Sequence, residues 1–330
     1  MAFVLPGKIT ETEFYNLIFV KGKSADSVHS VKTALRTFDK FCLVNHSKSR
    51  AELVQDIKSS DAGLKLLMDF KAWLLSNTKK QSHAVGTTRN YISAVRKWLK
   101  FVGGIRIDSN DFKDFLVFPS YEREDEEAEP LTHENLRIII DHFANPKRKA
   151  LFMFMKSTAA RTKEALQIKK GYFDFNAKPV SVIFPRGIVK GKTRKRVQFV
   201  DGEAVPMIKL LAKNCSDDDF IFRKNLGITL ETERNNIIKN WSDVVTKLGF
   251  NERYANGRLK HNIHSIRAFC MTQYEKATKD ERLAHAYGGH RAYLDQYLRR
   301  SESEKAALFE QAEPYLAINT KFIFSEKVTN

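Results

Sequence analysis

Four short segments of this chain carry side chains that can cleave and rejoin a phosphodiester bond. In chain order they are residues 160–166 (ARTKEAL), 190–193 (KGKT), 264–267 (HSIR) and 289–297 (GHRAYLDQY). From these segments a single site can draw two guanidiniums, an amine, two imidazoles and a phenol. Their order and spacing indicate one site built from distant parts of the chain.

This set of groups can break a phosphodiester without a metal ion. A phenol can attack phosphorus and hold the cut strand as a phosphotyrosine ester. Two arginines can bind the non-bridging oxygens bidentately and stabilise the charge of the pentacoordinate transition state, which lysine does less well. A lysine or a histidine can protonate the departing ribose oxygen. The residue types therefore predict strand-transfer chemistry.

The order arginine, lysine, His-x-x-Arg, Gly-His, tyrosine resembles the tyrosine recombinase (phage integrase) family of DNA strand exchangers. Residues 160–166 fit the family's first arginine motif, a small residue followed by Arg-x-x-Glu-Ala/Leu-Leu, and the similarity extends over about residues 131–316. Each motif alone occurs by chance in many helices. All of them in order, on a basic chain, form a specific pattern.

The resemblance implies a role for each matching residue. The catalytic set is then Arg161, Lys192, His264, Arg267, His290 and Tyr297. Glu164 is expected to orient the active-site arginine, and His290 to hydrogen-bond the phosphate. His264 and Arg267 are three residues apart on one predicted helix face, so both can point at one phosphate.

Two assignments keep an alternative. Tyr293 and Tyr297 are four residues apart and share a helix face, and both lie closer to His290 than the family's nucleophile usually does. We favour Tyr297, since residues 290–297 look like the compact variant found in archaeal members. Lys190 and Lys192 both flank the position of the family's catalytic lysine, which precedes an arginine equivalent to Arg196. Lys192 is preferred because Lys192-Thr193 resembles the family's Lys-Thr turn.

One position departs from the family pattern. Gly288 stands where many members have leucine before Gly-His, and we interpret this change as the loss of an apolar anchor.

No metal or cofactor is expected. His264 with His261 or Cys270 lacks the paired spacing of zinc ligands. A phosphotyrosine conserves the energy of the broken bond, so strand exchange needs neither ATP nor a metal. The three cysteines (Cys42, Cys215 and Cys270) are far apart and odd in number, which is typical of reduced thiols in a cytoplasmic protein.

The charge of the chain also indicates a DNA partner. Its 330 residues include 56 Lys and Arg against 39 Asp and Glu, a net charge of +17. By segment, residues 1–120 hold 19 basic and 11 acidic side chains, residues 121–130 hold 1 and 6, and residues 131–330 hold 36 and 22. Membrane association is not expected, because no stretch approaches the roughly 20 apolar residues of a span and no signal peptide is evident.

The acidic break predicts the domain organisation. The run EREDEEAEP within residues 122–130 cannot bury a face and repels itself, so we expect an exposed linker. It would join a helical DNA core-binding domain (residues 1–121) to a catalytic domain with a C-terminal tail (residues 131–330).

Apolar periodicity predicts helices before the linker. One face carries Leu35, Phe38 and Phe41, another Leu67, Phe70 and Leu74, and a third Tyr91, Val95, Trp98, Leu99 and Val102. Thr87 or Thr88 is expected to cap the third helix, and Gly103-Gly104 to end it. The opposite face of that helix holds four basic residues, which we expect to contact DNA phosphates: Arg89, Arg96, Lys97 and Lys100.

The catalytic half is predicted to be mainly helical with a small antiparallel sheet. Residues 181–184 and 196–200 are β-rich and flank a polar turn that carries the candidate lysines. Thr132 is expected to cap a helix, and further helices are expected over residues 150–156, 232–248, 264–275, 280–286 and 292–299. The fold class is thus mainly α, a helical domain followed by an α+β tyrosine recombinase catalytic domain.

The expected function is site-specific recombination by an integrase or resolvase, through a 3′-phosphotyrosine intermediate. The resemblance implies a monomer that assembles as a homotetramer on double-stranded DNA with specific recombination sites, forms a Holliday junction, and docks its apolar tail after Pro314 on a neighbouring protomer. The tail residues concerned are Tyr315, Leu316, Ile318, Phe322 and Ile323. A type IB topoisomerase-like relaxase and a non-catalytic DNA-binding protein on the same scaffold are the alternatives, and a C-terminal helix packed on its own domain is the alternative for the tail.

The excess charge predicts how DNA binding responds to salt. If phosphate contacts dominate, the association constant should fall by several log units per log unit of salt, for about six or more neutralised phosphates. Titrating duplex DNA at increasing ionic strength measures this slope. A nearly flat profile would contradict a DNA-binding function.

Overall fold

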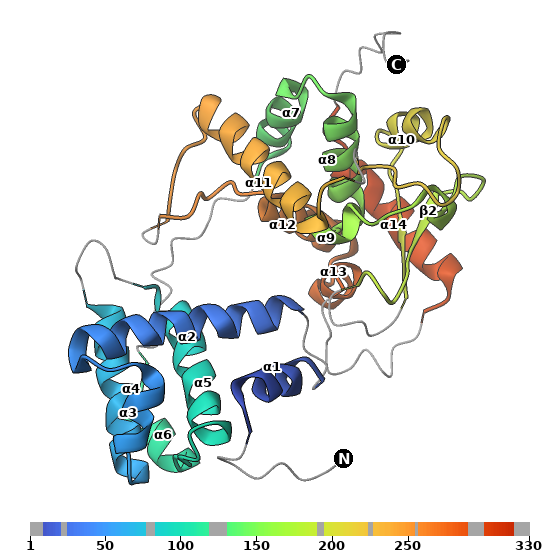
Figure 1. Cartoon of the computed structure of the whole chain (residues 1–330). Coiled ribbons are helices and arrows are strands. Elements are labelled where there is room, and N and C mark those ends of the chain that lie inside the picture. Colours follow the sequence, from blue (N-terminus) through green and yellow to red (C-terminus); the bar gives the residue numbers. More distant parts are fainter. Residues whose placement is uncertain are drawn as a thin grey trace. The chain divides into compact units, whose positions relative to one another are not determined.

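The computed structural model describes residues 9–20, 25–76, 83–118, 131–189, 195–223, 227–254, 257–289 and 300–319. The chain divides into two compact units, residues 1–126 and residues 127–330 (Figure 1). The acidic segment 122–130 and the helix expected over residues 292–299 lie outside the described residues. Within the described ranges, no helix has both the length and the apolar character that a membrane span requires.

The described part of the first unit is helical throughout. Its helices are α1 (Glu11–Val20), α2 (Ala25–His46), α3 (Arg50–Asp56), α4 (Ser60–Leu75), α5 (Val85–Phe101) and α6 (Ser109–Phe115). The predicted apolar faces of α2, α4 and α5 meet in one core, where Phe38, Phe70 and Trp98 are buried. Ser49 and Ser59 cap α3 and α4 by accepting backbone N–H bonds. The periodicity therefore identified the helices that build this core.

The predicted start of α5 was wrong. The helix begins at Val85, with Ala84 as its N-cap, and Thr88 is fully buried within it. A threonine that is buried between helices is not available to cap an exposed helix end. The predicted end is close to the observed one, because α5 stops at Phe101 and Gly104 has a positive φ of 72°.

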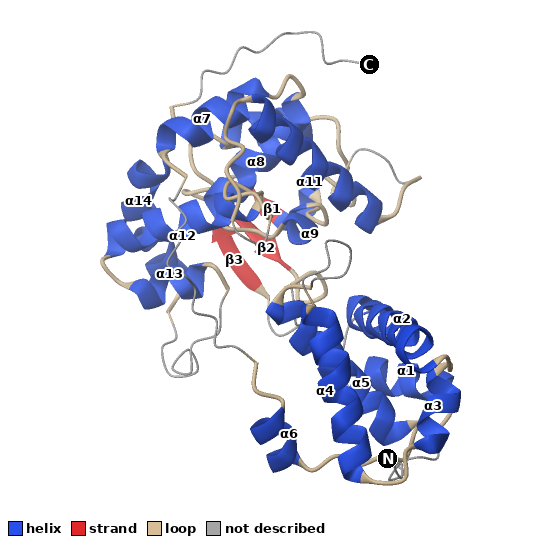
Figure 2. Cartoon of the chain, turned by 90° about the vertical axis from the view of Figure 1, so that its left-hand side faces the viewer, coloured by secondary structure: helices blue, strands red, loops and turns tan. Residues whose placement is uncertain are grey.

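The second unit surrounds a three-stranded antiparallel sheet with helices (Figure 2). Its described helices are α7 (His133–His142), α8 (Pro146–Thr158), α9 (Thr162–Ala165), α10 (Val205–Ala212), α11 (Leu230–Lys247), α12 (His264–Thr278), α13 (Glu281–Tyr287) and α14 (Glu302–Leu316), with the 3₁₀ turn η1 (Lys170–Tyr172). The strands are β1 (Phe173–Asp174), β2 (Ser181–Phe184) and β3 (Arg196–Phe199). The two predicted strands pair with Val182 opposite Gln198. Thr132 caps α7 as expected, accepting from the amide of Asn135 at 3.1 Å.

Helix α8 forms the centre of this unit. Asn145 caps it and Pro146 occupies its first turn, where a missing N–H costs nothing. Every residue from 150 to 158 is buried, and α7, α9, α10, α12 and β3 all pack against the helix. The helix ends at Ala159, which adopts the left-handed conformation with φ 50°. This turn directs the chain toward Arg161.

The C-terminal segment packs on its own unit, which corrects part of the expected tail. Pro314 lies inside α14 rather than before a tail, and α14 packs along α12. Leu316 and Ile318 are buried in the core of the same unit, so neither is available to a neighbouring protomer. Tyr315 is half-exposed, and Phe322 and Ile323 lie outside the described residues.

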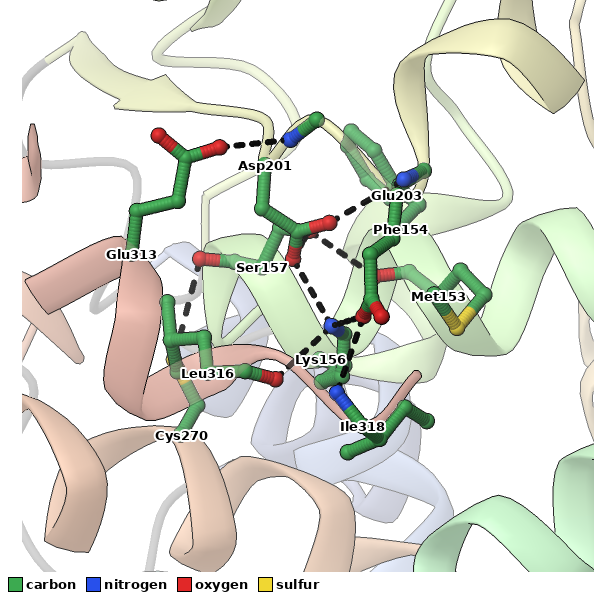
Figure 3. Close-up of polar contacts among 12 residues, drawn as sticks. Met153, Phe154, Lys156, Ser157, Asp201, Glu203, Cys270, Glu313, Leu316 and Ile318 are labelled. Carbon is green, nitrogen blue, oxygen red and sulfur yellow. Dashed lines mark hydrogen bonds and ion pairs between the residues drawn. The ribbon is translucent and has the colours of Figure 1, made fainter. Parts of the chain in front are cut away.

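A buried lysine holds this segment in place (Figure 3). Lys156 of α8 is fully buried, and its Nζ lies 3.0 Å from Asp201 Oδ2, 2.8 Å from Glu203 Oε2 and 2.8 Å from the carbonyl oxygen of Leu316. Glu203 in turn accepts from the amide of Ile318 at 3.0 Å. One ammonium group therefore joins α8, the loop after β3 and the end of α14.

Lys156→Ala should strongly destabilise the second unit. The change leaves the Asp201 and Glu203 carboxylates in the interior without their cation, which typically costs about 3–5 kcal/mol. Urea unfolding followed by circular dichroism measures the loss. Lys169→Ala is the control, because Lys169 pairs at 2.7 Å with a carboxylate, Asp218, that is 92% exposed. Equal unfolding midpoints for the two variants would contradict a structural role for Lys156.

Candidate active site

Arg161 lies where the chain turns from α8 into α9. It is the N-cap of α9, and the carboxylate of Glu164 accepts from its backbone amide at 3.1 Å and from its Nη1 at 3.0 Å. The residue three positions into a helix often reaches back to the first amide in this way. The Arg-x-x-Glu spacing therefore fixes the backbone of Arg161 and one side of its guanidinium, while the side chain stays 23% exposed.

Arg267 lies in the first turn of α12 and is 7% exposed. Its Nη1 donates to the carbonyl of Ala159 and its Nη2 to the carbonyl of Gly288. Burial, together with the nearby charges of Arg161 and Arg196, lowers the pKa of Arg267 to about 10. The guanidinium stays protonated at neutral pH. Its hydrogen bonds connect α12 to the turn at Ala159 and to Gly288.

Arg196, at the start of β3, completes a cluster of three guanidiniums. Its Nη2 donates to Glu164 Oε2 at 3.1 Å, and its Nη1 lies 3.5 Å from the carbonyl of Gly288. The guanidinium lies over the ring of Phe184, 4.6 Å from the centroid. Burial lowers its pKa, against the pull of Glu164. In the sequence analysis, Arg196 served only to locate the position of the expected catalytic lysine. An arginine at the start of the β-rich run 196–200 could also have indicated a site residue.

Glu164 balances only part of this charge. Its side chain is 3% exposed and pairs with both Arg161 and Arg196, while Arg267 adds a third positive charge nearby. The cluster of four side chains therefore carries a net charge of +2. A half-buried surplus of positive charge is what a phosphate group requires.

His264 lies beside this cluster at the first position of α12. Its backbone amide donates to Asn262 Oδ1 at 3.0 Å, and its side chain is exposed. Burial of part of the ring lowers the pKa of His264, and the charges of Arg258, Arg234, Arg267 and Arg161 lower it further. Both effects favour the neutral ring, which can donate a hydrogen bond and is a poor general acid. Arg234 and Arg258 were not identified from the sequence, because neither residue belongs to a motif with a recognisable spacing.

The segment just before His290 is tightly held. Tyr287 is buried, and its hydroxyl donates to the carbonyl of Ser157 at 2.7 Å. Gln198 donates to the carbonyl of Tyr287, and the Tyr287 ring stacks on Tyr274 with centroids 4.3 Å apart. The Gly288 amide donates to Ala284 at 2.9 Å.

The interpretation of Gly288 as a lost apolar anchor is wrong. A Cβ at this position would lie 2.7 Å from Met271 Sδ and 3.2 Å from Arg267 Nη2, so side chains from α12 already fill the space. The buried ring of Tyr287 anchors the segment instead. Gly289 has φ +70°, and a Cβ there would lie 2.3 Å from Arg196 Nη1.

The structure brings together Arg161, Glu164, His264 and Arg267 of the predicted set. The other five predicted residues lie outside the described residues: Lys190, Lys192, His290, Tyr293 and Tyr297. Among the residues that the structure describes, no group of three or more His, Cys, Asp or Glu could hold a metal ion.

The basic residues of α5 differ in their surroundings. Arg89 and Lys97 are exposed, whereas Lys100 is half-buried. Arg96 also has an internal role, because its Nη2 donates to the carbonyl of Ile107 at 3.0 Å and its guanidinium covers the ring of Phe112 at 4.0 Å. On α2, an exposed basic stripe recurs every three or four residues, a signal that sequence reasoning missed: His29, Lys32, Arg36 and Lys40.

Comparison with known sequences identifies the family. A model of the phage integrase family matches residues 129–300, which include the arginine cluster, His264 and both candidate tyrosines.

The chain belongs to the phage integrase family. No curated protein matches its sequence.

Solved structures share the fold of this chain. XerH site-specific recombinase bound to palindromic difH substrate, in a post-cleavage complex, is 15% identical with a TM-score of 0.56, and the match covers 90% of this chain and 84% of XerH. The Tn1549 transposon integrase in complex with transposon right-end DNA is 16% identical with a TM-score of 0.50, over 84% of this chain and 98% of that protein. These similarities show a mainly helical tyrosine recombinase fold with a small antiparallel sheet.

Proposed function

We propose that this protein is a site-specific DNA recombinase that cuts and rejoins DNA through a 3′-phosphotyrosine intermediate. The observation that carries the proposal is the cluster of Arg161, Arg196 and Arg267 around the single carboxylate of Glu164. Its net positive charge lies beside His264 and directly before the segment that contains Tyr297. A phosphate bound there would lie among the donors that its transition state needs.

Each group has a task in the proposed reaction. Arg161 and Arg267 bind the non-bridging oxygens. His264 and His290 each donate a further hydrogen bond to the phosphate. The hydroxyl of Tyr297 gives its proton to the unprotonated ring nitrogen of His264, and its oxygen forms a bond to phosphorus while the bond from phosphorus to the 5′-oxygen breaks. Lys192 gives a proton to that oxygen, which leaves as a 5′-hydroxyl. Attack by the 5′-hydroxyl of a partner strand reverses the step, so no external energy is needed.

The proposed DNA contacts lie on both units. Residues 1–121 would act as the core-binding domain, with phosphate contacts from α2 and from Arg89, Lys97 and Lys100 of α5. Residues 131–330 would act as the catalytic domain, joined to it by residues 122–130. Net charge and the DNA complexes of XerH and of the Tn1549 integrase support a duplex DNA partner. A homotetramer on two sites, with exchange through a Holliday junction, is the proposed working form.

Two assays separate this function from the other classes. The wild-type protein selects its binding site from a random or genomic duplex library, and plasmids with one or two copies of that site are then substrates. A recombinase rearranges the two-site plasmid. A type IB relaxase would remove supercoils without rearrangement, and a non-catalytic binder would leave both plasmids unchanged.

Tyr297→Phe should abolish the covalent protein–DNA adduct. The change removes only a hydroxyl, so folding and DNA binding should survive while the nucleophile is lost. Denaturing gel electrophoresis of protein incubated with the selected duplex detects the adduct, and Tyr293→Phe is the matched control. Loss of the adduct in Tyr293→Phe and its retention in Tyr297→Phe would reverse the assignment.

Lys192→Ala should cleave ordinary DNA slowly and recover on DNA with a bridging sulfur. Without an acid the 5′-oxygen must leave as an alkoxide, whereas a thiolate departs readily unprotonated. Arg161→Ala and Arg267→Ala should show no recovery, because they act on the non-bridging oxygens. Recovery in Lys190→Ala alone would transfer the role to Lys190. Recovery in neither lysine variant would place the acid elsewhere.

A further inference from the structure

We infer that Arg196 is a positioning residue. It keeps the guanidinium of Arg161 available to the phosphate, and it fixes the backbone of Gly288 and Gly289, directly before the segment that contains the proposed nucleophile. This inference rests on the proposed function. It concerns a residue outside the predicted catalytic set, and three of its contacts support it: the carboxylate of Glu164, the backbone of Gly288 and Gly289, and the ring of Phe184.

The first task is electrostatic. Glu164 Oε1 accepts from Arg161 Nη1, while Oε2 accepts from the Arg161 amide and from Arg196 Nη2. Removing Arg196 would free Oε2 to accept a second bond from the Arg161 guanidinium. The resulting bidentate pair is strong and cancels the charge of Arg161. Arg196 thus keeps Glu164 from capturing the arginine that must bind the phosphate.

The second task is steric. The guanidinium of Arg196 presses on Gly289 so closely that a Cβ there would lie 2.3 Å from Nη1. The same Nη1 lies 3.5 Å from the Gly288 carbonyl, which also accepts from Arg267. Residue 290 follows directly. Two guanidiniums therefore fix the backbone from which the His290 to Tyr297 segment departs.

The contacts of Arg196 indicate that it acts through its neighbours rather than on DNA. Its Nη2 donates to Glu164, its Nη1 faces Gly288 and Gly289, and the ring of Phe184 covers one face of its guanidinium. Replacing it should therefore change the rate of cleavage far more than the salt dependence of DNA binding.

The test compares Arg196→Gln, Arg196→Lys and the control Lys195→Gln, which removes an exposed charge from the adjacent position. The probe is the selected duplex, nicked beside its mapped cleavage position so that adduct formation cannot reverse. Arg196→Gln should slow adduct formation by about 100-fold, the usual effect of misplacing reacting groups by about 1 Å. Arg196→Lys should be intermediate, because an amine can pair with Glu164 but cannot also reach the Gly288 carbonyl as the planar fork does. Lys195→Gln should match the wild type.

A double-mutant cycle with Gly289→Ala tests the steric contact. Alone, Gly289→Ala should slow adduct formation, because its Cβ collides with Arg196 and its φ is positive. In the Arg196→Ala background the collision is absent, so the added methyl should cost much less. Additivity would overturn the positioning role.

The outcomes separate this inference from the proposed function. No adduct from the wild-type protein would overturn the proposed function. An adduct from the wild type with an undiminished rate in Arg196→Gln would overturn only the role of Arg196. A reduced salt slope of DNA binding in Arg196→Gln would show a direct phosphate contact and would also overturn it. If circular dichroism shows that Arg196→Gln does not fold, Arg196→Lys takes its place, because this variant keeps the buried charge. Arg196→Lys is then compared with the wild type and combined with Gly289→Ala.

Discussion

The second unit depends on one buried carboxylate shared between two arginines. Glu164 accepts from both Arg161 and Arg196, and the charges of these two arginines add to burial in lowering the pKa of the nearby Arg267. Three guanidiniums in a partly dry space repel one another, and their desolvation adds to the cost. A single carboxylate offsets part of this cost but leaves a surplus of positive charge. A fully neutralised cluster would be more stable, but it would have no net positive charge to attract a phosphate.

The backbone carbonyls of two tight turns complete the arrangement. Arg267 donates to Ala159, in a left-handed turn, and to Gly288, directly before a second left-handed turn at Gly289. Charge-assisted bonds of this kind are strong in a buried setting. The cations that would bind DNA therefore also hold the backbone near the site, so the geometry of the site and the local fold cannot be separated. Lys156 acts in a similar way, because its ammonium group joins α8, the loop after β3 and the end of α14.

The errors of sequence reasoning have a common cause. Thr87 or Thr88 was expected as a helix cap, Gly288 as a lost anchor, and Leu316 and Ile318 as part of a tail docked on a neighbouring protomer. In each case the residue type is compatible with an exposed position, and packing partners far away in sequence decided otherwise. Thr88 is covered in the helical core, Met271 and Arg267 fill the space at Gly288, and Ile318 joins the core of its own unit. Arg96, expected to contact DNA, was found to hold the turn before α6 as well.

The sequence by itself determined the family, the fold class, the core faces of the main helices and the pairing of the two longer strands. These follow from periodicity, turn residues and motif order, which are local properties or fixed spacings. It also determined that Arg161 pairs with the carboxylate of Glu164, because the two residues are three positions apart, within one helical turn. Only the tertiary structure decided that Arg196 shares this carboxylate, that four arginines help to lower the pKa of His264, and that Tyr287 anchors the chain before His290. Those facts depend on which side chains, up to 130 residues apart, meet in a desolvated space, and neither composition nor spacing encodes that meeting.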